Sequence, residues 1–117
     1  MPDNPAVDFS RLRDVYEDDT AGMLELYDLM LKNGAMHLDK LDAAIRDRDC
    51  EGVRKAAHSL KGSSGNVGAM PLSRLAAQVE DAARDEQWDK ITELSGGLRP
   101  AFQRVSEAVA AFRAGES

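Results

Sequence analysis

The sequence predicts an all-α protein: an antiparallel four-helix bundle with a short additional helix at its N-terminal end. Three observations support this fold class. Apolar residues recur every three or four positions through most of the 117-residue chain, and no stretch keeps the period of two that is typical of strands. Polar turns with helix-capping residues separate the long apolar-periodic segments. A hydrophobic content of 43% is enough for one core without metal or disulfide support.

The first three helices can be placed from their caps. A short helix is expected to begin after Asp8 as the N-cap residue and to end at the acidic turn 17–20, which also caps the next helix. Its apolar side is expected to carry Phe9, Leu12, Val15 and Tyr16. A long second helix has its apolar positions over residues 23–45. Asp49 is expected to cap a third helix that ends near Gly68, since glycine is common just after a last helical turn.

The remaining helices follow from two prolines and a glycine pair. Pro71 suits the first turn of a fourth helix, because its missing N–H has no partner there in any case. The last helical segment is expected over residues 87–113. Gly96, Gly97 and Pro100 weaken its middle, so we expect a kink or a short break there.

Composition limits the classes of function. One domain is expected over residues 8–113, with flexible tails at 1–7 and 114–117. The N-terminus lacks the features of a secretory signal, and no apolar run reaches membrane-spanning length. A net charge of −6 without a basic stripe argues against nucleic acid as the main partner. With Cys50 as the single cysteine, these features predict a soluble, cytoplasmic monomer.

His58 lies on a predicted helix face that has few bulky side chains. At about 100° per residue, Lys61, Gly62 and Gly65 fall within about 60° of His58, and the apolar residues of the helix lie opposite. A glycine inside a helix costs ~1 kcal/mol relative to alanine, so helix stability does not explain these glycines. The pattern indicates a nucleophile kept open for a large partner. The alternative, close helix packing, is expected to place glycines on the apolar face instead.

His58, Lys61 and Gly62, followed by Gly68, resemble the signature of histidine-containing phosphotransfer (HPt) domains of two-component phosphorelays. The similarity extends over about residues 8–112 and includes the helix pattern on both sides of the signature. The resemblance implies a four-helix bundle whose exposed histidine accepts a phosphoryl group from one receiver-domain aspartate and relays it to another. The partners that it implies are response-regulator receiver domains and a sensor histidine kinase.

Roles for individual residues follow from the resemblance and from side-chain chemistry. His58 is the expected phosphoacceptor, since a neutral imidazole is a nucleophile near pH 7. The resemblance implies that Nε2 attacks and that a group on the following helix orients the ring. Glu80 occupies the matching position, with Gln78 as the alternative. Lys61 is expected to pair with the phosphoryl oxygens, and Gly62 to leave room beneath them.

Four further residues are candidates for contact with the partner. Arg54 and Lys55 lie one turn before His58 and carry positive charge that can steer an acidic receiver pocket. Gly65 is expected to widen the clearance around the histidine. Met70 and Leu72 are apolar docking candidates, unless they are buried in the hydrophobic core instead.

The chain is expected to be a phosphocarrier and not an enzyme, with no ATP site or bound cofactor of its own. Magnesium is expected to come from the receiver. The glycine-rich run 62–68 lacks the ending of a P-loop and follows no strand. Two alternatives remain open: a non-phosphorylated adaptor that binds a receiver or kinase, and an excised phosphotransfer domain of a larger hybrid kinase, although Met1 favours a free-standing protein.

Overall fold

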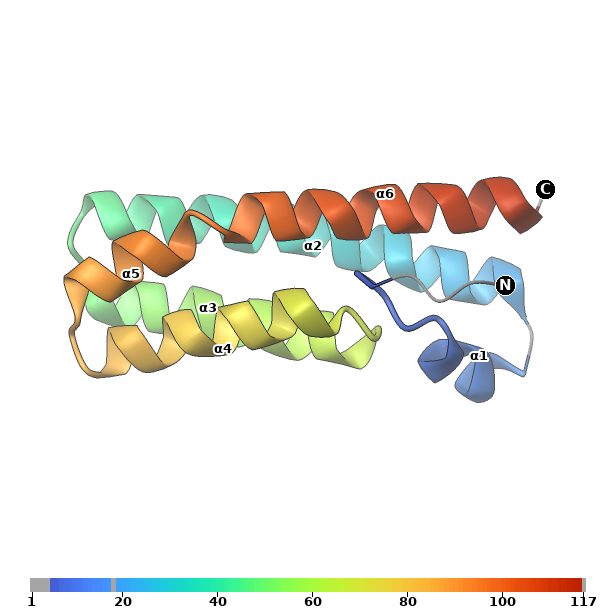
Figure 1. Ribbon diagram of the computed structural model, residues 1–117, viewed down its shortest axis with the longest axis horizontal. Helices are drawn as coiled ribbons and strands as arrows, with labels where there is room; N and C mark the ends of the chain where they lie inside the picture. The colour runs from blue at the N-terminus through green and yellow to red at the C-terminus, as the bar shows by residue number, and fades with distance from the viewer. Residues whose placement is uncertain (1–4, 18, 117) are drawn as a thin grey trace.

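The computed structural model describes residues 5–17 and 19–116, and this part of the chain forms helices and no strands. The helices are α1 (Ser10–Tyr16), α2 (Thr20–Arg46), α3 (Cys50–Asn66), α4 (Met70–Arg84), α5 (Trp88–Ser95) and α6 (Leu98–Glu116). Three arms of an antiparallel bundle are α2, α3 and α4, and α5 continues into α6 as the fourth arm (Figure 1). The short α1 lies at one end of the bundle. The predicted fold class is therefore confirmed.

Aspartate residues cap the N-terminal ends of α2 and α3. The Asp19 carboxylate accepts a hydrogen bond from the backbone N–H of Gly22 at the start of α2. The Asp49 carboxylate accepts one from Gly52 at the start of α3, at 3.0 Å. Each bond satisfies a backbone donor that has no partner inside its helix. Both predicted caps are thus confirmed.

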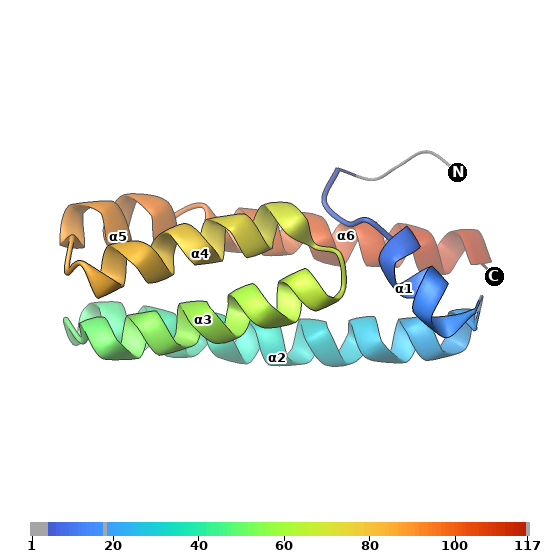
Figure 2. The same ribbon diagram turned by 90° about the horizontal axis from the view of Figure 1, so that it is seen from below.

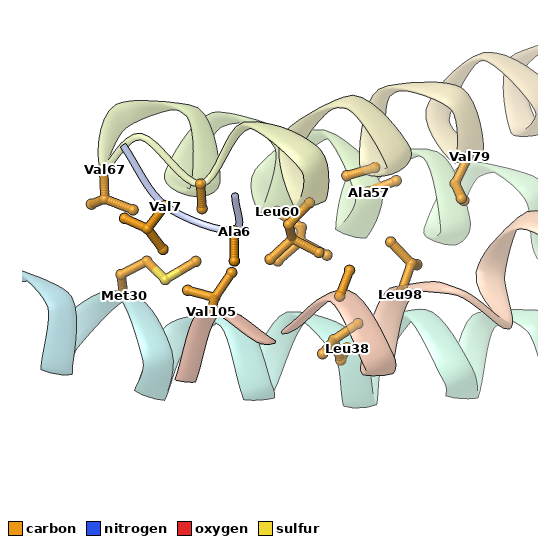
Figure 3. Packing of buried hydrophobic residues seen from close by; sticks show 14 of the residues in the cluster. Ala6, Val7, Met30, Leu38, Ala57, Leu60, Val67, Val79, Leu98 and Val105 are labelled. Carbon is orange, nitrogen blue, oxygen red and sulfur yellow. The ribbon is translucent and has the colours of Figure 1, made fainter. Parts of the chain in front are cut away.

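The predicted flexible tail at 1–7 is wrong for its last two residues. Ala6 and Val7 are buried, and Val7 lies beside Met30 and Val67 in the core (Figure 3). The pair α3–α4 is shorter than α2 and α6, so apolar surface at one end of the bundle needs another cover (Figure 2). The N-terminal segment provides this cover. The first four residues lie outside the part of the chain that the structure describes.

Asp8 and Gly68 join the N-terminal segment to the turn between α3 and α4. The backbone N–H of Asp8 donates to the carbonyl oxygen of Gly68 at 2.9 Å, and the Asp8 carboxylate accepts from the N–H of Ser10. Helix α1 begins at Ser10, so Phe9 is its N-cap residue, one residue later than predicted, and the Phe9 side chain makes no capping hydrogen bond. Gly68 has a φ of 81°, and a Cβ there would collide with the Asp8 carbonyl, so the turn requires glycine.

The break in the last arm falls where it is predicted. Gly96 and Gly97 separate α5 from α6, and Pro100 lies in the first turn of α6, where its missing N–H leaves no helical bond unmade. The expected tail at 114–117 is helical as far as Glu116, which corrects that expectation. Once a helix is formed, each added residue contributes a further backbone hydrogen bond, so the helix continues beyond its last core contact.

A continuous apolar core fills the space between the four arms. Its largest fully buried side chains include Tyr27, Phe112, Met23, Leu38, Leu41, Leu60, Leu72, Ile91 and Leu98. One expected core position is wrong: Val15 is 72% exposed, because α1 is short and contacts the bundle through its other side. Among the described residues, no helix has both the length and the apolar character needed to cross a membrane.

Candidate functional site

Three polar side chains meet where α3 and α4 pack against each other. Glu80 of α4 is only 4% exposed. Its Oε2 lies 2.8 Å from Nδ1 of His58, and its Oε1 lies 2.7 Å from Nζ of Lys61. His58 and Lys61 are one turn apart on α3, so a single carboxylate reaches both. The His58 side chain nevertheless remains 61% exposed, which leaves the outer edge of the ring open to a partner.

The contact with Glu80 determines which ring nitrogen of His58 is free. A carboxylate only accepts hydrogen bonds, so the neutral ring carries its proton on Nδ1 and its free lone pair on Nε2. Burial alone would raise the pKa of Glu80, but the hydrogen bonds from Lys61 and His58 and their charges outweigh it and lower this pKa. Glu80 is therefore an anion at neutral pH.

The structure places Glu80 against the ring, and Gln78 away from it. Gln78 and Glu80 are two positions apart on α4, which corresponds to a rotation of about 200° around the helix axis. Their side chains therefore leave α4 on different sides. Gln78 is exposed and lines a groove between α4 and α5 together with Asp81, Asp85 and Glu93. The sequence leaves the choice between the two residues open, and the register of α4 on α3 decides it.

Gly62 and Gly65 have different surroundings. A Cβ at Gly62 would meet no atom within 4 Å, as expected for a face kept clear beside His58. A Cβ at Gly65 would lie 3.2 Å from Oγ of Ser73 on α4. Gly65 therefore lies where α3 packs against α4. The prediction that it widens the clearance around the histidine is wrong. The packing surface of α3 toward α4 extends beyond its apolar face, which is why a helical wheel misses this contact.

Lys61 and Ser73 make contacts that the sequence does not reveal. Lys61 is expected to face the phosphoryl group, but its ammonium is paired with Glu80. The buried Ser73 hydroxyl donates to the backbone carbonyl of Lys61 at 2.9 Å and so ties α4 to the site. Ser73 lies seven residues before Glu80 and thus on the same face of α4, which is the signal that could have identified it.

The basic candidates lie on α3 near the histidine. Arg54, one turn before His58, makes two hydrogen bonds to Glu51, at 2.6 and 3.0 Å. Lys55 is exposed and lines a groove between α2 and α3 that also contains His37. Glu51 therefore balances the charge of Arg54, and Lys55 supplies positive charge on the side of the histidine toward the start of α3. No group of three or more potential ligand side chains is placed to hold a metal ion among the described residues.

The apolar docking candidates are not near the histidine. Met70 is the first residue of α4, ten residues from Glu80 and therefore about 15 Å away along the helix. Its sulfur contacts the Arg11 guanidinium of α1 at 3.3 Å. Leu72 is fully buried in the core. The structure thus brings His58, Lys61, Gly62 and Glu80 together and places Met70 and Leu72 elsewhere.

Comparisons with known proteins agree with this arrangement. The family model of the Hpt domain matches residues 25–115, which include α3 and α4. Among solved structures, the chain is similar to histidine-containing phosphotransfer protein B (HptB) from Pseudomonas aeruginosa PAO1. The two are 27% identical with a TM-score of 0.86, over 93% of this chain and 95% of that chain. No curated protein matches the sequence.

Proposed function

Because this chain belongs to the Hpt domain family and is a histidine phosphotransfer protein of phosphorelays, we propose that His58 carries the phosphoryl group. One observation supports this assignment above the others: an exposed imidazole whose inner nitrogen lies 2.8 Å from a buried carboxylate. The sequence has one other histidine, His37, on α2. Burial and Lys40 lower the pKa of His37, and it has no carboxylate partner among the described residues.

The proposed reaction forms one bond and breaks one. The Nε2 lone pair of His58 attacks the phosphorus of a receiver's aspartyl phosphate, so an N–P bond forms. The P–O bond to the aspartate breaks, and its electron pair stays on the released carboxylate. No proton is transferred, and the positive charge that develops on the ring faces the Glu80 carboxylate through Nδ1–H. Transfer to a second receiver is the reverse of these events.

The same proposal assigns the partners and their contributions. Receiver domains donate and accept the phosphoryl group, and a sensor histidine kinase supplies it at the start of the relay. Magnesium is expected in the acidic pocket of the receiver, and ATP at the kinase. Lys55 contributes positive charge that attracts such a pocket, while the charge of Arg54 is balanced by Glu51, and the open space at Gly62 admits the pocket.

A labelling experiment tests the phosphoacceptor. Incubation with a receiver that is phosphorylated on its aspartate is expected to give this protein an acid-labile, base-stable label. His58→Gln is expected to abolish the label, and His37→Gln is the matched control that keeps it. Circular dichroism checks that both variants are folded. A label that persists in His58→Gln would contradict the assignment, and a wild-type protein that binds the receiver without labelling would favour the adaptor alternative.

A further inference from the structure

Helix α1 contacts the end of α3 that follows His58, and the proposed reaction leaves this contact without a role. We infer that Arg11 of α1 is a positioning residue for phosphoryl transfer, which acts by holding the final segment of α3, residues 62–66, in helical form. The inference rests on the proposed function of His58 as the phosphoacceptor. It gives α1 a part in the chemistry of a site to which it contributes no reacting group.

The final segment of α3 has a weak intrinsic preference for the helix. Its five residues read Gly-Ser-Ser-Gly-Asn. Glycine loses the most conformational entropy in a helix, and serine and asparagine side chains compete for backbone hydrogen bonds, so all five positions are poorer than alanine. The last turn of α3 also has no basic residue of its own to balance the partial negative charge at a helix C-terminus. This segment therefore depends on contacts from outside α3.

Arg11 supplies both a hydrogen bond and a positive charge at this end of α3. One terminal nitrogen of its guanidinium donates to the carbonyl oxygen of Gly65 at 3.3 Å and lies 3.3 Å from the sulfur of Met70, at the start of α4. Helix α1 lies beside the turn between α3 and α4 in both views of the fold (Figures 1 and 2). A cation near a helix C-terminus is favourable because it balances the carbonyl dipoles there. Arg11 thus provides from α1 the charge that α3 lacks.

Residues on both sides of Arg11 in the sequence hold it in this position. Phe9 stacks on Phe112, and Leu12 is buried, so α1 is anchored to the core before and after Arg11. Arg11 itself is exposed. Its substitution therefore removes the contact with α3 without opening a void in the core.

The final segment of α3 in turn supports the site. In an α-helix each carbonyl accepts from the N–H four residues later, so the carbonyl of His58 depends on Gly62, and that of Lys61 on Gly65. Opening of this segment would release both bonds and let His58 and Lys61 move away from Glu80, which contacts both side chains. The rate of transfer is therefore expected to scale with the fraction of molecules in which the segment is helical.

Hydrogen exchange and transfer kinetics of R11M test this role. R11M should raise the exchange rates of the backbone amides of residues 62–66 about fivefold, the effect of losing one hydrogen bond. It should lower kcat/KM for phosphoryl transfer from a receiver about twofold, because fewer molecules have the helical segment. R11K keeps a cationic donor at this position and is expected to match the wild type in both measurements.

R46M is the matched control. Arg46 lies in the last turn of α2 and favours that helix C-terminus in the same way, but at the opposite end of α3. R46M should leave the exchange of residues 62–66 and the rate of transfer unchanged. Equal effects of R11M and R46M would show that Arg11 contributes only general stability, which would overturn the inference.

Stabilising the final segment from within should make Arg11 unnecessary. S63A and N66A replace two of its residues with the best helix former. The Ser63 hydroxyl donates to the carbonyl of Leu60 within α3, and among the described residues neither polar side chain bonds to another helix. Adding S63A/N66A to R11M should restore both slow exchange and kcat/KM. Recovery of exchange while kcat/KM stays low would indicate that Arg11 contacts the receiver directly, contrary to the inference.

The exchange measurement keeps this inference separate from the proposed function, because it is made on the unphosphorylated protein. Unchanged exchange at residues 62–66 in folded R11M would contradict the role of Arg11. Absence of a His58 label in the wild type would contradict the proposed function instead.

Discussion

A buried carboxylate is costly unless its charge is compensated, and Glu80 has two compensating partners. The hydrogen bonds from Lys61 and His58 hold the pKa of Glu80 below its ordinary value despite the opposing effect of burial. The same bonds orient the imidazole and leave its outer nitrogen free. One residue on α4 therefore serves both the stability of the helix pair and the chemistry on α3.

The lowered pKa of Glu80 predicts a pH dependence of stability. The ionised carboxylate stabilises the folded state fully above its unfolded pKa, near 4.5, and this contribution is lost as pH falls through the lower folded pKa. Glu80→Gln should therefore be less stable than the wild type by about 1 to 2 kcal/mol at about pH 5.5. Urea unfolding should show this difference shrinking toward about pH 3. A difference that stays constant over this range would contradict the assignment.

At the level of helices, α3 has two further surfaces besides its apolar face, and each of them contains one glycine. One surface is open at Gly62, and the other contacts Ser73 of α4 at Gly65. The two glycines have the same intrinsic cost in a helix, but the surrounding structure gives them different reasons to be there. Gly62 leaves space for a partner, and Gly65 permits the close approach of two helices.

Alanine substitutions should distinguish the role of Gly62 from that of Gly65. Gly62→Ala is expected to stabilise the fold by about 1 kcal/mol, because its Cβ meets open space, and to slow phosphoryl transfer by narrowing the site. Gly65→Ala is expected to bring no such gain, because its Cβ presses on a hydroxyl that is hydrogen-bonded to Lys61. Thermal unfolding and transfer rates measure both effects.

Ser73 provides the control for that experiment. In a Ser73→Ala background the obstructing oxygen is gone, and Gly65→Ala should recover the gain from helix propensity. Equal stabilisation by both alanine substitutions in the wild-type background would show that the contact at Gly65 does not restrict this position.

At the scale of the whole molecule, the N-terminal segment completes the bundle. The hairpin of α3 and α4 covers only part of the length of α2 and α6, and α1 with residues 5–9 covers the rest (Figures 1 and 2). Phe9 stacks on Phe112 with ring centroids 4.5 Å apart. Phe9 and Phe112 thus bring segments near the start and the end of the chain together at one end of the core.

Two valines in this region make a matched pair for a stability test. Val7 is 1% exposed and Val15 is 72% exposed. Val7→Ala should cost about 1 to 2 kcal/mol, because it leaves a void beside Met30 and Val67. Val15→Ala should change stability by less than about 0.5 kcal/mol. Urea unfolding measures both, and His58 should be labelled normally in each. Equal effects on stability would contradict the burial of the N-terminal segment.

Much of the fold could be predicted from local sequence. Asp19 and Asp49 cap their helices, Gly68 ends α3, and the break at Gly96 and Gly97 divides the last arm. These features depend on backbone hydrogen bonds and dihedral preferences within a few residues, so the local sequence contains the information. The buried N-terminal segment could not be predicted this way, because its cover of the core depends on the unequal lengths of the arms.

The candidate site likewise combines features that the local sequence predicts with contacts that only the tertiary structure shows. The sequence by itself determined the helices, the face of α3 that carries His58, and the open space at Gly62, because periodicity along one helix is a local property. Only the tertiary structure decided between Glu80 and Gln78, turned Lys61 toward a carboxylate, and placed Gly65 against Ser73. Each of these contacts joins two helices, and their axial register and rotation follow from the packing of the whole core, which no single segment specifies.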